Sequence, residues 1–166
     1  MENCNQLPTP TRVEAPLGTD ANGSEAKNDW TNSYDSIIAM MLYMSSNTIP
    51  YTSFAVQQCT WCTHNTKASH EKAVKRICRY LQGTKDNVLV FNAFKKLVVY
   101  CYVDADFARL FFARSRNGFV VTFSNCLLLW VSKIQIEISI PTRHSGYVAF
   151  SHSVRELLPL KVLSRK

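Results

Sequence analysis

The sequence predicts an α+β fold: a helical N-terminal part, then an antiparallel meander of strands, then one C-terminal helix. Between residues 33 and 84, apolar side chains recur every three or four positions, the spacing of helices with one buried face. After Gly83 the period changes to two, in β-branched and aromatic runs separated by short polar turns. Helical spacing returns at about residue 145. The length of 166 residues suggests one domain, or one domain plus a tail, and the hydrophobic content of 46% is enough to build a core.

Residues 1–32 are expected to form an extended or disordered leader. They hold three of the six prolines and two of the five glycines, and they show no sustained apolar period. No apolar run opens the chain, so no secretory signal is predicted, and no run approaches the ~18 residues that span a bilayer. The rest divides into a helical connection segment at 33–84 and a strand-rich domain at 85–166.

Three helices are expected before the strands. The first begins at Ser33 and carries a broad apolar stripe that includes Tyr34, Ile38 and Met41. Pro50 suits the first turn of a second helix, because its missing N–H and fixed φ fit that position. The residues of this second helix that are predicted to point inward are Phe54, Ala55 and Cys59.

The clearest helix covers residues 69–82. Ser69 is predicted to be its N-cap, and Gly83 is predicted to end it in a left-handed conformation. One face of this helix is apolar. The opposite face is strongly cationic and consists of Lys72, Lys75, Arg76 and Arg79.

The predicted strands lie in the apolar runs at 87–91, 95–106, 118–124 and 126–140. In the last run Ile134 and Ile136 alternate with Gln135, which predicts a half-buried strand with the isoleucines inward and the glutamine outward. The final helix is expected from about 145 to 161, with Pro159 ending or kinking it.

The positive charge is concentrated in the middle of the chain. The formal net charge is +7, and residues 60–116 alone hold 11 basic and 4 acidic side chains. A phosphate-rich partner, such as DNA or an RNA–DNA hybrid, would complement this charge. A solvated basic face explains it equally well. Neither a membrane nor a small-molecule substrate is predicted as a partner.

The six cysteines are predicted to be free thiols, as in a reducing compartment, so an intracellular location in the cytoplasm or nucleus is expected. Cys59, Cys62 and His64 have spacings that also occur in zinc sites. A structural zinc site needs four ligands, and coincidence is the favoured explanation here.

Two carboxylates, Asp104 and Asp106, end the second apolar run. Alternation along a strand places them on the same side, roughly 7 Å apart. Such a pair can share a divalent cation, but Mg²⁺ prefers near-octahedral oxygen coordination and usually takes further ligands. The alternative is that both acids are solvated charges at the end of an edge strand.

Six motifs follow one another between about Asp29 and Leu163: SNTIPYTSFAVQQC, SHEKAVKRICRYLQGTK, VDADFA, RSRNGF, LLWVSK and TRHSGYVAFSHSVRE. In their order and near their spacing they resemble the end of a copia-type retrotransposon polyprotein, where the reverse transcriptase passes into ribonuclease H. The leader segment PTPTRVEAPLGTD also resembles the connecting segment of that family. Each motif is modest alone, and together they are specific.

The resemblance implies a ribonuclease H-like meander followed by a helix, with acids that hold two Mg²⁺ ions and cut the RNA strand of a hybrid. Its first acid carries over to Asp104, with Asp106 beside it. Its second is the glutamate of an S-T-x-x-[AS]-E-Y motif, which here reads PTRHSGY with Gly146 in the glutamate position. Its third acid and its polymerase acids have no match here. The domain is therefore expected to be truncated, its aspartates vestigial and its cofactor lost.

Three hypotheses remain open from the sequence. The first is a degenerate polyprotein fragment without catalytic activity, in which apolar residues at 110–112 favour non-specific self-association. The second is a nuclease with substituted metal ligands, in which Asp104 and the nearby His144 and His152 would bind the metal. The third is a non-specific nucleic-acid-binding module, with phosphate contacts from Lys72, Lys75, Arg76, Arg79, Lys95, Lys96, Arg114 and Arg116.

Overall fold

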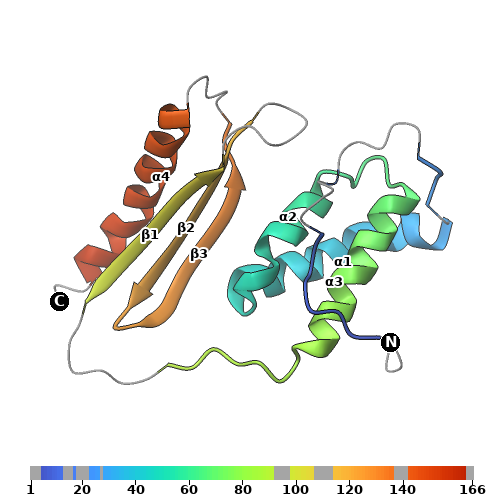
Figure 1. Cartoon of the computed structure of the whole chain (residues 1–166), viewed down its shortest axis with the longest axis horizontal. Helices are drawn as coiled ribbons and strands as arrows, with labels where there is room; N and C mark the ends of the chain where they lie inside the picture. Colours follow the sequence, from blue (N-terminus) through green and yellow to red (C-terminus); the bar gives the residue numbers. More distant parts are fainter. Residues whose placement is uncertain are drawn as a thin grey trace. The chain divides into compact units, whose positions relative to one another are not determined.

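The structure, a computed structural model, describes residues 5–12, 17, 23–26, 28–91, 98–106, 114–136 and 142–163. In this part of the chain three helices precede a three-stranded sheet, and a fourth helix follows it, which confirms the predicted α+β class (Figure 1). The chain divides into two compact units, Met1–Val88 and Leu89–Lys166. None of the described helices is long and apolar enough to cross a bilayer. Lys95, Lys96 and the 110–112 patch lie outside the described residues.

The first unit is helical. Its elements are α1 (Asn28–Asn47), a 3₁₀ turn (Pro50–Thr52), α2 (Ser53–Thr60) and α3 (Ala68–Gly83). Their shared core consists of the buried side chains of Tyr34, Ile38, Met41, Ala55, Val56, Cys59, Val74 and Ile77. Pro50 opens the 3₁₀ turn before α2, close to its predicted role. Phe54, which was predicted to point inward, is exposed.

The helix boundaries differ from the sequence prediction at three points. The first helix starts at Asn28 rather than Ser33. Ser69 lies inside α3, whose N-cap is the extended residue Lys67; the N–H of Lys67 donates a hydrogen bond to Nδ1 of His70 at 3.0 Å. Gly83 is the last residue of α3 and does not have a positive φ, so the predicted left-handed termination is wrong.

Parts of the leader contact α3. The N–H of Ala68 donates to the backbone oxygen of Ser24 at 3.0 Å, and a side-chain hydrogen bond joins Arg76 to Thr9. A Cβ added at Gly83 would lie 3.2 Å from Cβ of Gln6. The described residues 5–12 therefore run beside α3 (Figure 1). These residues form no helix or strand, as in the extended form of the predicted leader, and they are joined to α3 by these contacts.

The second unit contains the predicted antiparallel meander, with strand order β1-β2-β3. The strands are β1 (Val99–Asp106), β2 (Arg116–Phe123) and β3 (Cys126–Ile134). Ser124 and Asn125, with φ values of 50° and 61°, form the two-residue turn between β2 and β3, which is the conformation that matches strand twist. Residues 87–91, predicted as a strand, have no regular structure among the described residues.

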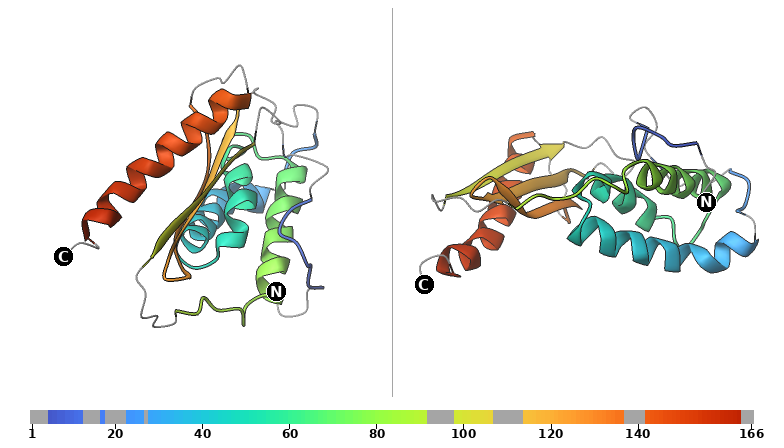
Figure 2. Two further views of the ribbon diagram at one scale, coloured as in Figure 1. Left: turned by 60° about the vertical axis from the view of Figure 1, so that its left-hand side comes forward. Right: turned by 90° about the horizontal axis from the view of Figure 1, so that it is seen from below.

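Helix α4 (Thr142–Leu163) covers one face of the sheet (Figure 2). Phe119 of β2 is opposite Val103 of β1 and Val131 of β3, so these three side chains share a face. The ring of Phe119 lies 5.9 Å from that of His152 in α4, which places α4 on this face. The helix continues through Pro159 to Leu163, beyond its predicted end.

The chain beyond β3 contradicts the predicted alternation. Gln135 is buried and Ile136 is 81% exposed, the reverse of the expected pattern. Strand β3 ends at Ile134, so the period of two no longer applies. Nε2 of Gln135 instead donates to Oδ1 of Asn117 at 2.5 Å and to the backbone oxygen of Ser145 at 2.8 Å. Glu137 and the residues up to 141 lie outside the described part.

Candidate functional site

The two aspartates lie on the face of the sheet that α4 leaves open. Along β1 exposure alternates, and Tyr100, Tyr102, Asp104 and Asp106 are the exposed positions. The predicted common side of the two acids therefore agrees with the burial pattern. Oδ1 of Asp104 accepts a hydrogen bond from the N–H of Ala105 at 2.8 Å. Asp104 thus has a local backbone partner and is accessible to solvent.

Gly146 does not lie beside these acids. It is in the second turn of α4, which packs on the opposite face of the sheet, and its neighbours Ser145 and Ala149 are the residues of this turn that are fully buried. A Cβ added at Gly146 would have no atom within 4 Å. A glutamate side chain at 146 would therefore fit without a clash, but it would lie on the face of the sheet that α4 covers. Asp104 is on the opposite face.

The described residues contain no group of three or more His, Cys, Asp or Glu side chains that could hold a metal ion. His144 and His152 do line one cavity of about 340 Å³ between α4 and the end of β3. Its wall also includes the cations Lys133 and Arg155. A cavity with this lining favours an anion over a divalent cation.

Arg116 is beside the acids but does not belong to an exposed basic surface. It is opposite Asp106 in the β1–β2 register, and only 5% of it is exposed. Burial lowers the pKa of Arg116, and the nearby charge of Asp106 partly opposes that shift. Nη1 of Arg116 donates to Oγ of Ser132 at 3.3 Å. The prediction that Arg116 contacts phosphate from an exposed basic surface is therefore wrong. Arg114 is exposed.

The predicted cationic face of α3 is present, but two of its four members have protein partners. Lys75 forms an ion pair with Glu71 one turn earlier. Arg76 donates from Nη2 to Oγ1 of Thr9 in the leader at 2.7 Å. The two members that α3 leaves exposed are Lys72 and Arg79.

The cysteine pair of the possible zinc motif is buried in the first unit. Burial raises the pKa of the Cys59 thiol to about 12, and it also raises the pKa of Cys62. The hydroxyl of Tyr34 donates to the backbone oxygen of Cys59 at 3.1 Å, and His64 is exposed. Zinc binds thiolates, so an environment that favours the neutral thiols does not suit it.

Sequence reasoning missed the contacts that Gln135 makes. This side chain connects β2 to the first turn of α4 through Asn117 and Ser145. A glutamine between two isoleucines carries no local signal for burial. Only the buried acceptors supplied by other elements explain its position.

The fold and the acidic pair together define a class: an α+β protein in which an antiparallel meander carries two aspartates and is followed by a helix. Comparison with curated proteins finds relatives that are similar in sequence. The chain is 28% identical to the retrovirus-related Pol polyprotein from transposon TNT 1-94 of Nicotiana tabacum, over 97% of this chain and 12% of the polyprotein. It is 28% identical to secreted RxLR effector protein 161 of Plasmopara viticola, over 80% of this chain and 94% of that protein.

A third relative is the putative transposon Ty5-1 protein YCL074W of Saccharomyces cerevisiae, 25% identical over 75% of this chain and 41% of that protein. The chain therefore spans only a small part of the tobacco polyprotein and less than half of the yeast protein. The similarities to the tobacco and yeast transposon proteins relate the chain to retrotransposon polyproteins and confirm the resemblance at that level. No protein-family model matches the sequence. No solved structure matches it either.

Proposed function

We propose that this chain is a segment of a copia-type Pol polyprotein from the passage between reverse transcriptase and ribonuclease H, and that it has no nuclease activity of its own. One observation carries the second part of the proposal. Asp104 and Asp106 are on the open face of the sheet, whereas position 146, where the family has its next acid, holds glycine on the helix that covers the other face.

The chemistry of hybrid cleavage explains why this arrangement matters. Two-metal hydrolysis uses one ion to activate water and a second to stabilise the leaving oxygen, and both ions need carboxylate ligands. Mg²⁺ further requires near-octahedral oxygen coordination. Asp104 and Asp106 supply two carboxylates, and the guanidinium of Arg116 is near Asp106 and offsets part of its charge. Two carboxylates with a guanidinium beside them are better suited to water and Arg116 as neighbours than to holding two divalent ions.

An RNA–DNA hybrid cleavage assay tests the proposal directly. The whole chain is incubated with a labelled hybrid in Mg²⁺ or in Mn²⁺, beside a matched preparation of Asp104→Asn. We expect both proteins to give the background rate. Cleavage by the parent that Asp104→Asn abolishes would overturn the proposal, and equal cleavage by both would identify a contaminating nuclease.

Gly146→Glu is a second, geometric test. If position 146 lies across the sheet from Asp104, the added carboxylate cannot complete the site, and the variant stays at the background rate. Hybrid cleavage that appears in Gly146→Glu and disappears in Gly146→Glu with Asp104→Asn would show that the two positions converge.

A second candidate function, non-specific nucleic-acid binding, is favoured by the exposure of Lys72 and Arg79 on α3. These residues are seven positions apart and therefore lie on one side of the helix. Phosphate contacts release counterions, so the affinity for a duplex should fall steeply with salt. Replacing Lys72 and Arg79 by Gln should reduce the log–log salt slope by about 2, roughly one for each contact.

The matched control for this binding is Arg143→Gln, which removes an exposed cation from α4 in the other unit. Its salt slope should equal that of the parent. The same loss per charge removed in both, which is half as large in Arg143→Gln as in the double α3 variant, would mean that net charge, rather than a surface on α3, determines the binding.

A further inference from the structure

Two cations from different elements line one cavity of the second unit. Lys133 of β3 and Arg155 of α4 are both in the wall of the cavity of about 340 Å³ between the end of β3 and α4. None of the described residues in this wall is an Asp or a Glu. Both cations are exposed, and neither forms an ion pair with another described residue. Because like charges repel unless an anion lies between them, this wall favours a negatively charged ligand.

The strand register explains why a lysine lies beside α4. Asn117 is opposite Lys133, and the next pair on the same face is Phe119 with Val131. The ring of Phe119 contacts α4, so Asn117 and Lys133 continue the covered face to its end. On α4 the lining residues recur every three or four positions, as on one side of a helix: His144, Val148, Ser151 and Arg155. Regular elements therefore hold the opposing walls of the cavity.

Asn117 supplies a buried hydrogen-bond donor to this wall. The residue is 4% exposed, and its Oδ1 accepts a hydrogen bond from Nε2 of Gln135 at 2.5 Å. Since this contact turns the amide oxygen toward Gln135, the amide nitrogen Nδ2 is the group that Asn117 offers to a ligand. Gln135 is fixed in turn by its bond to the backbone oxygen of Ser145 at 2.8 Å. The donor is thus oriented before a ligand binds, which lowers the cost of binding.

We propose that this cavity binds a small organic phosphate, a phosphomonoester of about nucleotide size. Lysine and arginine form charge-assisted hydrogen bonds with phosphate oxygens, and the planar guanidinium of Arg155 can do so with two N–H groups at once. Nδ2 of Asn117 and the hydroxyl of Ser151 add uncharged donors. The volume is at the lower end of the roughly 300–1,000 Å³ of small-molecule pockets, so there is room for an organic group beside the phosphate.

The organic group would contact the aromatic and apolar part of the wall. Tyr147 is 73% exposed and Ile136 is 81% exposed, and both line the cavity, so they lie where it opens to solvent. A tyrosine ring offers a flat surface on which a planar base can stack. A nucleoside monophosphate is therefore a suitable probe, because its phosphate matches the two cations and its base matches Tyr147.

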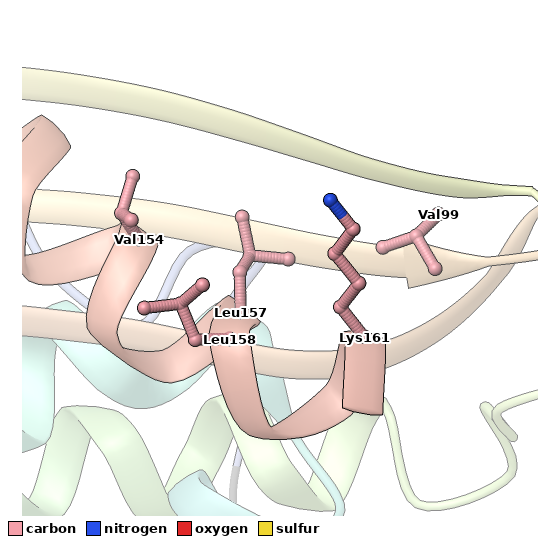
Figure 3. Close-up of a pocket in the computed structure, with 5 residues that line it drawn as sticks. All are labelled: Val99, Val154, Leu157, Leu158 and Lys161. Carbon is pink, nitrogen blue, oxygen red and sulfur yellow. The ribbon is translucent and has the colours of Figure 1, made fainter. Parts of the chain in front are cut away.

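Another hollow in the described part of this unit has different chemistry. It is a groove of about 330 Å³ lined by one cation, Lys161, and by four aliphatic residues: Val99, Val154, Leu157 and Leu158 (Figure 3). A single cation among aliphatic side chains provides no pair of charges to hold a phosphate dianion. Lys161→Gln therefore removes one positive charge from the same helix outside the proposed site, and it is the matched control.

Titration of adenosine 5′-monophosphate into the whole chain, followed by backbone NMR, tests the proposal. We expect saturable binding with the largest shifts at Lys133 and along residues 148–155. Lys133→Gln and Arg155→Gln should each weaken the binding roughly tenfold, since each removes a charge-assisted contact from an exposed position. Lys161→Gln should bind like the parent. Adenosine, which lacks the phosphate, should not saturate the site, and inorganic phosphate should bind more weakly than the nucleotide.

Asn117→Asp tests the oriented donor. The variant keeps an oxygen for Gln135 and replaces the Nδ2 donor by a carboxylate oxygen, so its affinity for the nucleotide should fall further than in either cation variant. The spectrum of the free variant reports whether its fold is kept, and the two exposed cation variants test the site independently of that result. Unchanged affinity in Lys133→Gln and Arg155→Gln, shifts confined to α3, or equal affinity for adenosine and its monophosphate would overturn the proposal. Equal affinity for inorganic phosphate would refute the organic part of the ligand.

Discussion

Gln135→Ala should lower the free energy of unfolding of the second unit by more than expected for an outward-facing strand residue, which is how the sequence pattern places Gln135. The side chain is 2% exposed, and its Nε2 donates to Asn117 at 2.5 Å and to the backbone of Ser145 at 2.8 Å. Each lost hydrogen bond costs roughly 1 kcal/mol, and leaving the buried Asn117 oxygen without this donor adds about 1–2 kcal/mol. The Ser145 carbonyl is in the first turn of α4, where a helical N–H can still reach it. We expect a total loss of about 2–4 kcal/mol in the free energy of unfolding.

Hydrogen exchange measured by mass spectrometry suits this test, because peptides from α1–α3 serve as an internal reference. A loss of 2–4 kcal/mol corresponds to exchange that is roughly 30- to 700-fold faster in the most protected amides of β2 and α4. Ile136→Ala, at a neighbouring residue that is 81% exposed, is the control and should change stability by less than about 0.5 kcal/mol. Unchanged protection of β2 and α4 in Gln135→Ala would refute the role given to this side chain.

The remaining predictions concern the first unit. Burial raises the pKa of Cys59 from 9.0 to about 12, so between these values the unfolded thiol loses its proton while the folded one keeps it. The free energy of unfolding should therefore fall as pH rises above 9, by at most ~1.4 kcal/mol per pH unit. Urea denaturation under reducing conditions should show a smaller loss with pH in Cys59→Ala than in the parent. The same dependence of unfolding free energy on pH in both proteins would contradict this. Tyr34→Phe removes the hydroxyl that donates to the backbone oxygen of Cys59 and should lower the free energy of unfolding by about 1 kcal/mol. The cost stays small because that oxygen also accepts the N–H of Cys62 and keeps one partner. A urea midpoint equal to that of the parent would argue against the hydrogen bond from Tyr34. Gly83→Ala should stabilise α3 by up to about 1 kcal/mol, because Gly83 has no positive φ and the added Cβ meets only Gln6. Clear destabilisation in thermal melts would indicate that residue 83 adopts a left-handed conformation.

Apolar periodicity located most of the elements, because it reflects burial directly. The stripe through Tyr34, Ile38 and Met41 became the core of α1, and the alternation along β1 placed Asp104 and Asp106 together on one face. The meander and the final helix also occur where the change of period predicted them.

The predictions that failed depend on contacts between distant parts of the chain. Gln135 is buried because acceptors from β2 and α4 meet there, and Arg116 is buried although its sequence neighbours are polar. Residues 87–91 have strand-like composition but pair with no strand in the part of the chain that the structure describes, and Val88 is 77% exposed. For the candidate site, the family resemblance predicted that Gly146 stands in the position of a glutamate. It could not predict that α4 and the two acids would lie on opposite faces of the sheet.

The proposal that Asp104 and Asp106 form an incomplete metal site is the centre of this account, and a Mg²⁺ titration followed by backbone NMR tests it most directly. We expect the amides of Asp104, Ala105 and Asp106 to shift weakly and without saturation through the millimolar range, as for solvated carboxylates. Saturable binding of two ions at micromolar Mg²⁺, with the amide of Gly146 shifting together with that of Asp104, would contradict the account.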